Sequence, residues 1–294
     1  MKASAFSYAR ATSVSNAIEL LVAHGERAKV LAGGQSLMPA MNLRLLAPEW
    51  IVDIGGLSEE LHGISVNGDR VTIGALTRHA DLLKSVEVAA HAPLLAEATG
   101  QIAHPAIRNR GTIGGSLAHA DPASELPACM VALDATIIVR GAAGERRIPA
   151  TQFFAGVYET ALSAVELLVA IELPAASRNS AHFFGEFARR HGDYAIVGLT
   201  AQAIVENDVL NELRAVFFGV SDRPQPAKAT ASLIKTTVTP ASLSQALEAL
   251  GEELDPLEDQ QANGAMRRHL AKVLLAQCVS KLLDRPELGA GGRP

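Results

Sequence analysis

Two pairs of adjacent glycines, each following an apolar segment, constrain the fold of this sequence more than any other feature. Gly33 and Gly34 follow the strand-like segment 29–31, and Gly114 and Gly115 stand much later, in GTIGGS. A single pair commonly marks a tight turn that needs positive φ. Glycines without Cβ atoms also allow successive backbone N–H groups to converge on one anion. Two such loops in one domain therefore favour a diphosphate that is held from both sides.

Hydroxyl side chains flank both glycine pairs and strengthen the prediction of a phosphate site. Ser36 follows the first pair, and Thr112 and Ser116 flank the second. Lys29 and Arg44 add positive charge near the first pair, and charge-assisted hydrogen bonds are the strong ones. The spacing matches neither GxGxxG nor GxxxxGK[ST], which argues against an ordinary Rossmann protein and a P-loop NTPase. A diphosphate-bridged dinucleotide fits two loops best.

Composition excludes several classes of protein. The 294 residues suggest about two domains. A net charge of −5 and only 4% aromatic residues give no reason to expect nucleic acid as a partner. Cys129 and Cys278 have no CxxC partner, so we expect no metal or iron–sulfur site in this chain. We expect free thiols in a soluble, cytoplasmic protein, because no segment has the length of a signal-peptide core or a membrane span.

Hydrophobic periodicity predicts mixed helices and strands. The amphipathic pattern over 12–23 predicts a helix capped by Ser13 or Ser15, and with neighbouring strands it suggests a small βαβ unit. The linker-like PAASRNS, 174–180, predicts a boundary before an α+β module. The further predicted strands are 29–31, 50–54, 70–73, 167–173, 195–204 and 215–220, and the further predicted helices are 79–83, 92–98, 240–250 and 263–283.

Three segments together resemble a known family. AGGQSLMPAMNLRL, HPAIRNRGTIGGSLAHADPASELPA and RRHGDYAIV are similar to segments of the FAD-binding subunits of molybdenum-containing hydroxylases, the xanthine dehydrogenase family. Within it, the sequence most resembles the medium, flavin-carrying subunits of the aerobic carbon monoxide dehydrogenase type. The resemblance covers nearly the whole chain.

The resemblance implies an α+β fold with a two-subdomain FAD-binding domain of the vanillyl-alcohol-oxidase (PCMH) type. A C-terminal α+β domain of the carbon monoxide dehydrogenase flavoprotein type follows it. We therefore expect the FAD-binding domain over 1–176, with subdomains of about 1–56 and 57–176. The C-terminal domain is expected over 177–286, and a disordered tail over 287–294 because that end is rich in Gly and Pro.

The resemblance also assigns cofactor-binding residues by their positions in these motifs. Asp121 has an alternative role as a turn cap before Pro122, and Tyr194 as an ordinary strand tyrosine. No catalytic side chain and no metal ligand is expected, because the flavin carries the redox chemistry. The residues expected to bind FAD are Lys29, Val30, Leu31, Ala32, Gly33, Gly34, Gln35, Ser36, Gly111, Thr112, Ile113, Gly114, Gly115, Ser116, Asp121, Glu125, Leu168 and Tyr194.

The function implied by the resemblance is electron transfer through FAD. The chain is expected to take electrons from [2Fe–2S] clusters of a small partner subunit and pass them to a final acceptor. A large partner subunit with the molybdenum cofactor hydroxylates the substrate, and the complex is expected to be a dimer of heterotrimers. Two alternatives are a self-contained flavin oxidase or dehydrogenase and a flavin-less assembly subunit.

Overall fold

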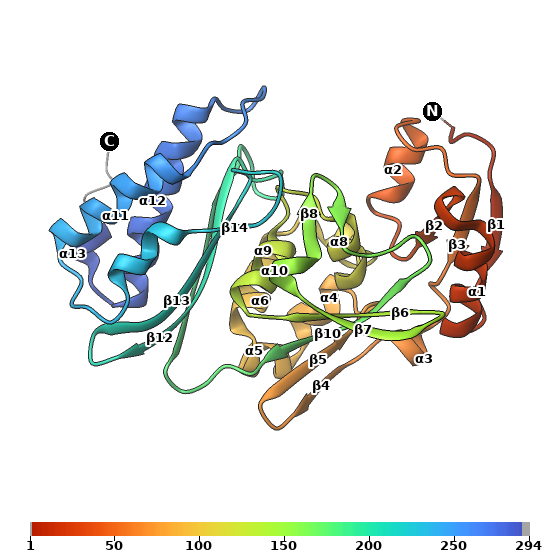
Figure 1. The fold of residues 1–294 in the computed structure, drawn as a ribbon, viewed down its shortest axis with the longest axis horizontal. Helices are drawn as coiled ribbons and strands as arrows, with labels where there is room; N and C mark the ends of the chain where they lie inside the picture. Colours follow the sequence, from red (N-terminus) through yellow and green to blue (C-terminus); the bar gives the residue numbers. More distant parts are fainter. Residues whose placement is uncertain (1, 290–294) are drawn as a thin grey trace.

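The computed structural model describes residues 2–289, which form three main sheets in succession along the long axis of the molecule (Figure 1). The first sheet has the strand order β1-β3-β2, and both neighbouring pairs are parallel. Parallel strands need crossover connections, and α2 lies in the connection between the neighbours β2 and β3, whereas α1 connects β1 to β2 on opposite edges of the sheet. The elements of this part are β1 (Ser7–Arg10), α1 (Val14–His24), η1 (Gly25–Arg27), β2 (Ala28–Leu31), α2 (Leu37–Asn42), β3 (Trp50–Asp53) and α3 (Ser58–Leu61).

The ends of α1 follow from local chemistry. The Ser13 side chain accepts a hydrogen bond of 3.0 Å from the backbone N–H of Asn16, which satisfies one free donor of the first turn. Gly25 ends the helix with φ of +53°, a conformation that suits glycine. The predicted helix, its Ser13 cap and the predicted βαβ arrangement are confirmed.

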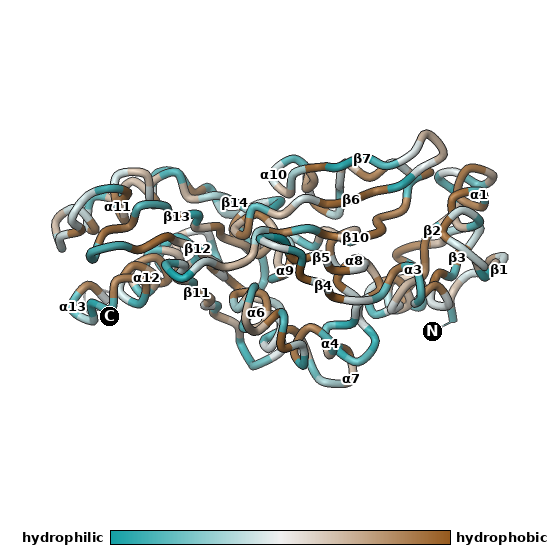
Figure 2. The backbone as a smooth tube through the Cα atoms, turned by 90° about the horizontal axis from the view of Figure 1, so that it is seen from below, coloured by the Kyte–Doolittle hydropathy of each residue, from teal (hydrophilic) through white to brown (hydrophobic). Residues whose placement is uncertain are grey.

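The second sheet is antiparallel, with the order β4-β5-β10-β6-β7. Figure 2 shows β6 and β10 largely apolar and the edge strand β7 hydrophilic, in agreement with the complete burial of Ile137, Val139 and Ile171. The elements are β4 (Ile64–Asn67), β5 (Arg70–Gly74), α4 (His79–Lys84), α5 (Val86–His91), α6 (Pro93–Gln101), α7 (Pro105–Arg108), α8 (Ile113–His119), α9 (Glu125–Ala132), β6 (Thr136–Gly141), β7 (Gly144–Pro149), α10 (Ala150–Phe153), β8 (Phe154–Gly156), β9 (Glu159–Thr160) and β10 (Leu167–Pro174).

The third sheet belongs to a C-terminal part with its own apolar core. Its order is β11-β12-β13-β14, antiparallel throughout, and α12 packs against β11 and β12. The elements are β11 (Ser180–Phe187), β12 (Val197–Glu206), β13 (Val209–Phe218), β14 (Gln225–Pro226), η2 (Lys228–Leu233), α11 (Pro240–Glu253), α12 (Gly264–Leu282) and α13 (Pro286–Gly289).

Helix α9 joins the second sheet to the third (Figure 1). All eight of its residues are buried, since it contacts α6, α8 and α10 as well as β12 and β13. A helix that is buried all round reads as a continuous apolar segment rather than an amphipathic one. This explains why the 3.6-residue pattern did not reveal α9 in the sequence.

The α+β class of the fold is confirmed, with one correction at the C-terminus. The expected disordered tail is wrong for 287–289, because these residues continue the short helix α13 and Leu288 is 3% exposed against the C-terminal core. Residues 290–294 of that expected tail lie outside the described residues. Within 2–289, no helix has both the length and the apolar character needed to cross a membrane.

Candidate functional site

The two glycine loops, far apart in the sequence, touch each other. A Cβ atom added to Gly33 would lie 2.2 Å from the carbonyl oxygen of Arg110 and 3.0 Å from the Cα of Gly111. No side chain larger than hydrogen fits this approach, so the backbone contact requires glycine at position 33. A cleft of about 300 Å³ runs beside the contact, and its lining includes Ala32, Gly33, Gly55, Ser58, His62, Leu76, Arg78, Asp81, Arg110 and Thr112.

The first loop, 32–36, presents free backbone donors. It leaves β2 and enters α2, and none of the N–H groups from Ala32 to Ser36 donates to a protein acceptor in the described structure. Gly34 has φ of +71°, and the Gln35 side-chain amide donates to the Gly33 carbonyl at 2.9 Å. A run of successive unpaired N–H groups is the donor set that an anion such as a phosphate needs. The loop therefore fits a phosphate group.

The second loop, 111–116, is the start of a helix rather than a second row of free donors. The Thr112 hydroxyl accepts from the N–H of Gly115 at 3.2 Å and caps α8. The Gly114 N–H donates to the Ala75 carbonyl at 2.9 Å, and a Cβ on Gly114 would lie 2.7 Å from the Cβ of Ala75. The expectation of bare amides at Gly114 and Gly115 is therefore wrong, because both N–H groups are used inside the protein.

The second loop has one free backbone N–H group and one side-chain hydroxyl as hydrogen-bond donors for a ligand. Within 111–116, Thr112 is the single residue whose N–H donates to no acceptor in the described part of the chain. The Ser116 hydroxyl, on a half-buried residue of α8, lies 3.1 Å from Nε2 of His79. The first loop therefore offers several backbone N–H donors, whereas the start of α8 offers one N–H group and one hydroxyl.

Three basic residues near the loops differ in their surroundings and hydrogen-bond partners. The Arg108 guanidinium donates to the backbone carbonyls of Ile102 and Ala103 at 2.6 and 3.0 Å. Lys29 is exposed on β2, and Arg44 donates to the Lys2 carbonyl. Within residues 2–289, none of these three side chains pairs with a carboxylate.

A second group of expected residues lies past the far end of α8. One carboxylate oxygen of Asp121 accepts from the Ala123 N–H at 2.9 Å, which is the turn-capping alternative. Tyr194 is largely exposed. Its partial desolvation, followed by the negative charges of Asp121 and Glu125, nevertheless raises its pKa. Asp121 and Tyr194 are thus neighbours although they belong to different domains.

No sequence pattern indicated a second tyrosine at this place. Tyr158 lies between β8 and β9 with φ of +57°, and its ring stacks on His119 with 4.8 Å between centroids. Burial, and then the Asp121 charge, raises its pKa. Because a bulky residue rarely adopts positive φ, the surrounding structure must hold this turn. No local pattern in VYET signals that position.

Arg267 fixes the chain segment that carries Tyr194. Its guanidinium, on a residue 5% exposed, donates to the carbonyls of Ile196 and Gly219 and pairs with Asp259 at 2.6 Å. The N–H of Gly219 in turn donates to the Pro122 carbonyl at 2.9 Å. A buried charge with these partners ties α12 of the C-terminal part to the turn after α8.

Leu168 lies on β10 where its pairing is irregular. The register with β6 shifts between Leu168 and Ala170, and β5 ends at Gly74 opposite Ala170. The backbone of Leu168 therefore has no strand neighbour on the β5 side, although its side chain is 4% exposed. This leaves main-chain groups for another partner.

Two carboxyl groups, one buried and one half-buried, have raised pKa values in this part of the structure. Glu125, at the start of α9, is 8% exposed, and burial together with the charge of Glu186 raises its pKa to about 7. Burial also raises the pKa of Glu186 on β11 to about 7, and its Oε2 has no hydrogen-bond partner. Carboxyls in such surroundings hold their protons at a higher pH than in water.

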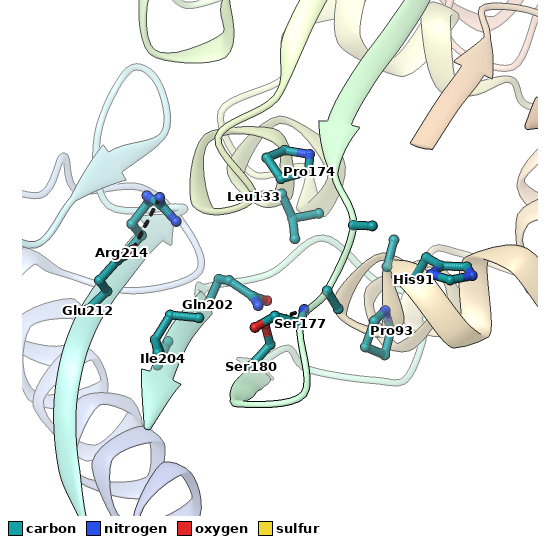
Figure 3. Close-up of a pocket in the computed structure, with 14 residues that line it drawn as sticks. His91, Pro93, Leu133, Pro174, Ser177, Ser180, Gln202, Ile204, Glu212 and Arg214 are labelled. Atoms are coloured by element: carbon teal, nitrogen blue, oxygen red, sulfur yellow. Dashed lines mark hydrogen bonds and ion pairs between the residues drawn. The ribbon is translucent and has the colours of Figure 1, made fainter. Parts of the chain in front are cut away.

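A second cleft, of about 220 Å³, lies between the 174–180 linker and the C-terminal sheet, as Figure 3 shows. Ser177, Ser180 and Gln202 line it together with Arg214, which pairs with Glu212 at 3.6 Å. None of the residues expected to bind a cofactor lines this cleft. The candidate site is therefore the glycine-loop contact with its surroundings.

The comparisons with known proteins agree with this geometry. The family model described as "FAD binding domain in molybdopterin dehydrogenase" matches residues 4–176, and the "CO dehydrogenase flavoprotein C-terminal domain" model matches 182–282. The 6-hydroxypseudooxynicotine dehydrogenase complex subunit alpha of Paenarthrobacter nicotinovorans is 38% identical, over 97% of each chain. The carbon monoxide dehydrogenase medium chain of Hydrogenophaga pseudoflava is 34% identical, over 94% of this chain and 96% of that one.

Solved structures show the same similarity in three dimensions. A chain of carbon monoxide dehydrogenase from Hydrogenophaga pseudoflava superposes with a TM-score of 0.94 at 35% identity, covering 97% of this chain and 99% of that one. A chain of quinoline 2-oxidoreductase from Pseudomonas putida 86 gives 0.90 at 35% identity, with the same coverage.

The fold and the glycine-loop site define an FAD-binding flavoprotein of the oxidoreductase class. The chain belongs to the family of FAD-binding medium subunits of molybdenum-containing hydroxylases, which includes those of carbon monoxide dehydrogenase and xanthine dehydrogenase. The family membership, the cofactor and the class of activity inferred from the sequence are confirmed.

Gly33→Ala should separate the loops and weaken FAD binding. The added Cβ would overlap the Arg110 carbonyl, and overpacking of this kind costs about 1–3 kcal/mol. We expect a purified variant with much less bound FAD and a lower melting temperature, measured by flavin absorbance and thermal unfolding. Gly100→Ala is the control, since its Cβ would lie 3.9 Å from Leu83 in open helix surroundings. Full FAD content in Gly33→Ala would contradict the close loop contact.

The raised pKa of Glu125 predicts a loss of stability as the pH rises. The folded chain holds the Glu125 proton up to about pH 7, whereas the unfolded chain releases it near the ordinary pKa of about 4.3. The free energy of unfolding should therefore fall between these values and then level off, by on the order of 3 kcal/mol for Glu125.

Glu125→Gln should make this dependence shallower, because an amide does not titrate, while Glu186 continues to contribute. Melting temperatures recorded from about pH 5 to about pH 8 check the prediction. Glu26→Gln, on the exposed surface, is the control that should keep the wild-type slope. Equal slopes in wild type and Glu125→Gln would show that Glu125 is not the titrating group.

Proposed function

We propose that this chain holds the FAD diphosphate at the contact of its two glycine loops and passes electrons from [2Fe–2S] clusters of a partner subunit to a final acceptor. The observation that carries the proposal is the row of unpaired N–H groups at 32–36, set against the second loop by the Gly33 contact. Bound FAD supplies the redox chemistry, and the protein binds and orients it. The expected absence of a nucleophile–base pair in this chain is consistent with that division.

We assign the binding roles as follows. The N–H groups of 32–36 bind one phosphate of the diphosphate. The Thr112 N–H and the Ser116 hydroxyl donate to the diphosphate from the opposite side. Lys29, Val30 and Leu31 bring the first loop into position, and Gly111, Ile113, Gly114 and Gly115 shape the start of α8. Asp121, Glu125, Leu168 and Tyr194 serve the remainder of the cofactor. Glu125 does so indirectly, because its side chain is buried.

The names of the similar proteins favour a multi-subunit complex. They are called subunit alpha, medium chain and FAD-binding subunit. We propose a small [2Fe–2S] subunit and a large molybdenum-cofactor subunit as partners, in a dimer of heterotrimers, with no role for nucleic acid. Both cysteines of this chain are buried free thiols, so a partner must bring the cluster ligands. Such thiols also support the proposed cytoplasmic location.

The domain limits stay part of the proposal. The last strand of the second sheet ends at Pro174 and the first strand of the third begins at Ser180, which supports a boundary at 176/177. The end of the first sheet at Asp53 and the start of β4 at Ile64 support a subdomain division at about residue 56.

The two alternatives predict different behaviour of the purified protein. A flavin-less assembly subunit has no need for a row of free N–H groups beside a loop contact, so we favour flavin binding. A self-contained oxidase would be reduced by its own organic substrate without partners. The substrate that the complex hydroxylates lies with the partner that holds the molybdenum cofactor.

We expect that co-expression with a cysteine-rich iron–sulfur subunit and a molybdenum subunit yields one complex that contains all three chains. Anaerobic addition of the hydroxylated substrate should then bleach the flavin absorbance of the complex but not that of this chain alone. Absorbance spectra after size-exclusion chromatography measure both outcomes. Bleaching of the isolated chain by the same substrate would support the oxidase instead, and a colourless chain would support the assembly subunit.

A further inference from the structure

We propose that His79 is a positioning residue that holds the Ser116 hydroxyl as a hydrogen-bond donor toward the FAD diphosphate. The proposal rests on the proposed function, because it takes Ser116 to face the cofactor. In the sequence His79 shows no spacing that suggests a role. The structure places it directly beneath the second glycine loop.

The position of His79 is fixed by its backbone and its ring together. It is the first residue of α4, and its N–H donates to the Gly111 carbonyl at 3.0 Å. The ring packs so closely under the loop that a Cβ on Gly111 would lie 3.0 Å from its Cε1. His79 is 3% exposed, and its Nε2 lies 3.1 Å from the Ser116 Oγ.

The buried ring is neutral, which limits it to one N–H group. Burial lowers the pKa of His79 to about 4, a backbone interaction with Thr112 offsets part of this effect, and the Arg108 charge lowers the pKa slightly further. Its Nδ1 has no hydrogen-bond partner in the described structure. Since an unpaired buried N–H is rarer and costlier than an unpaired acceptor, we assign the proton to Nε2. In this tautomer His79 donates to Ser116 Oγ.

This donation sets the direction of the Ser116 hydroxyl proton. A hydroxyl oxygen that accepts from Nε2–H keeps its own proton for a different acceptor. Among residues 2–289 that hydroxyl has no hydrogen-bond partner apart from His79, so its proton is available to a ligand. A phosphate oxygen is an acceptor with no proton to offer, and the arrangement suits it.

A purely structural role accounts less well for these facts. An apolar side chain would fill the space under Gly111 without leaving a buried nitrogen unpaired, and such atoms are costly. The nearby His62 shows the contrast, because it is exposed and pairs with Asp81 at 3.0 Å. What His79 adds beyond volume is the hydrogen bond to Ser116.

The test compares three substitutions at position 79 in the full-length chain. In His79→Gln the side-chain amide can reach the place of Nε2 and donate to Ser116. His79→Asn is too short to do so but stays polar, and His79→Leu keeps the volume without a donor. We expect the dissociation constant for FAD, measured by quenching of flavin fluorescence, to rise about tenfold in His79→Asn and His79→Leu. In His79→Gln it should stay within about threefold of the wild type.

A double-mutant cycle separates positioning from general structure. Ser116→Ala should weaken FAD binding, and adding His79→Asn to it should cause little further loss, since the hydroxyl is already absent. The ³¹P signals of bound FAD should shift in His79→Asn and remain in place in His79→Gln. His269→Gln, on the exposed face of α12 and outside both clefts, is the control and should bind FAD as the wild type does.

The outcomes separate the two proposals. Wild-type affinity in His79→Asn, a loss in His79→Gln equal to that in His79→Asn, or additive losses with Ser116→Ala would each overturn the role of His79 while FAD binding stands. A wild-type chain that binds no FAD would overturn the proposed function itself. If His79→Leu fails to fold, the comparison of the Gln and Asn variants still decides between these results.

Discussion

The contact of Gly33 with the peptide between Arg110 and Gly111 is the constraint on which the site depends. It joins the parallel first sheet to the helices of the second at a single backbone approach that excludes any Cβ. Because one side of the contact follows β2 and the other precedes α8, the two subdomains cannot shift there without opening the site. Rigid elements on both sides hold the donors in place before any ligand arrives, which lowers the cost of binding.

The two loops look alike in sequence but do different work. Four glycines suggested two equal cradles, yet the N–H groups of Gly114 and Gly115 are consumed by Ala75 and Thr112. Gly114 allows α8 to pack closely on Ala75, just after β5, whereas a Cβ on Gly115 would collide with the Thr112 hydroxyl that caps α8. A sequence shows where Cβ atoms are missing, but it does not show whether a glycine makes room for a ligand or for another part of the protein. The answer depends on residues that are distant in the sequence, and no sequence pattern indicated that Ala75 contacts Gly114.

Local signals in the sequence predicted local structure well. Ser13 and Gly25 mark the ends of α1 because caps act within a few residues. The pattern failed where tertiary contacts decide: α9 is buried on all sides, and the αL turn at Tyr158 is held by its surroundings. Family resemblance identified the cofactor, while the contact of Glu125 with FAD stays a prediction for a side chain that is 8% exposed.

Hydrogen bonds tie the C-terminal part of the chain to the turn between α8 and α9. Arg267 on α12 holds the carbonyls that flank the start of β12 and the end of β13, and Gly219 bonds across to Pro122 in the turn that ends in α9. The segment with Tyr194 is thereby tied to Asp121 through backbone hydrogen bonds. Since Tyr194 itself is exposed, its position comes from this anchoring and not from burial. Under the proposed role of Tyr194 in FAD binding, this anchoring keeps an aromatic neighbour of the cofactor fixed while the cofactor changes charge.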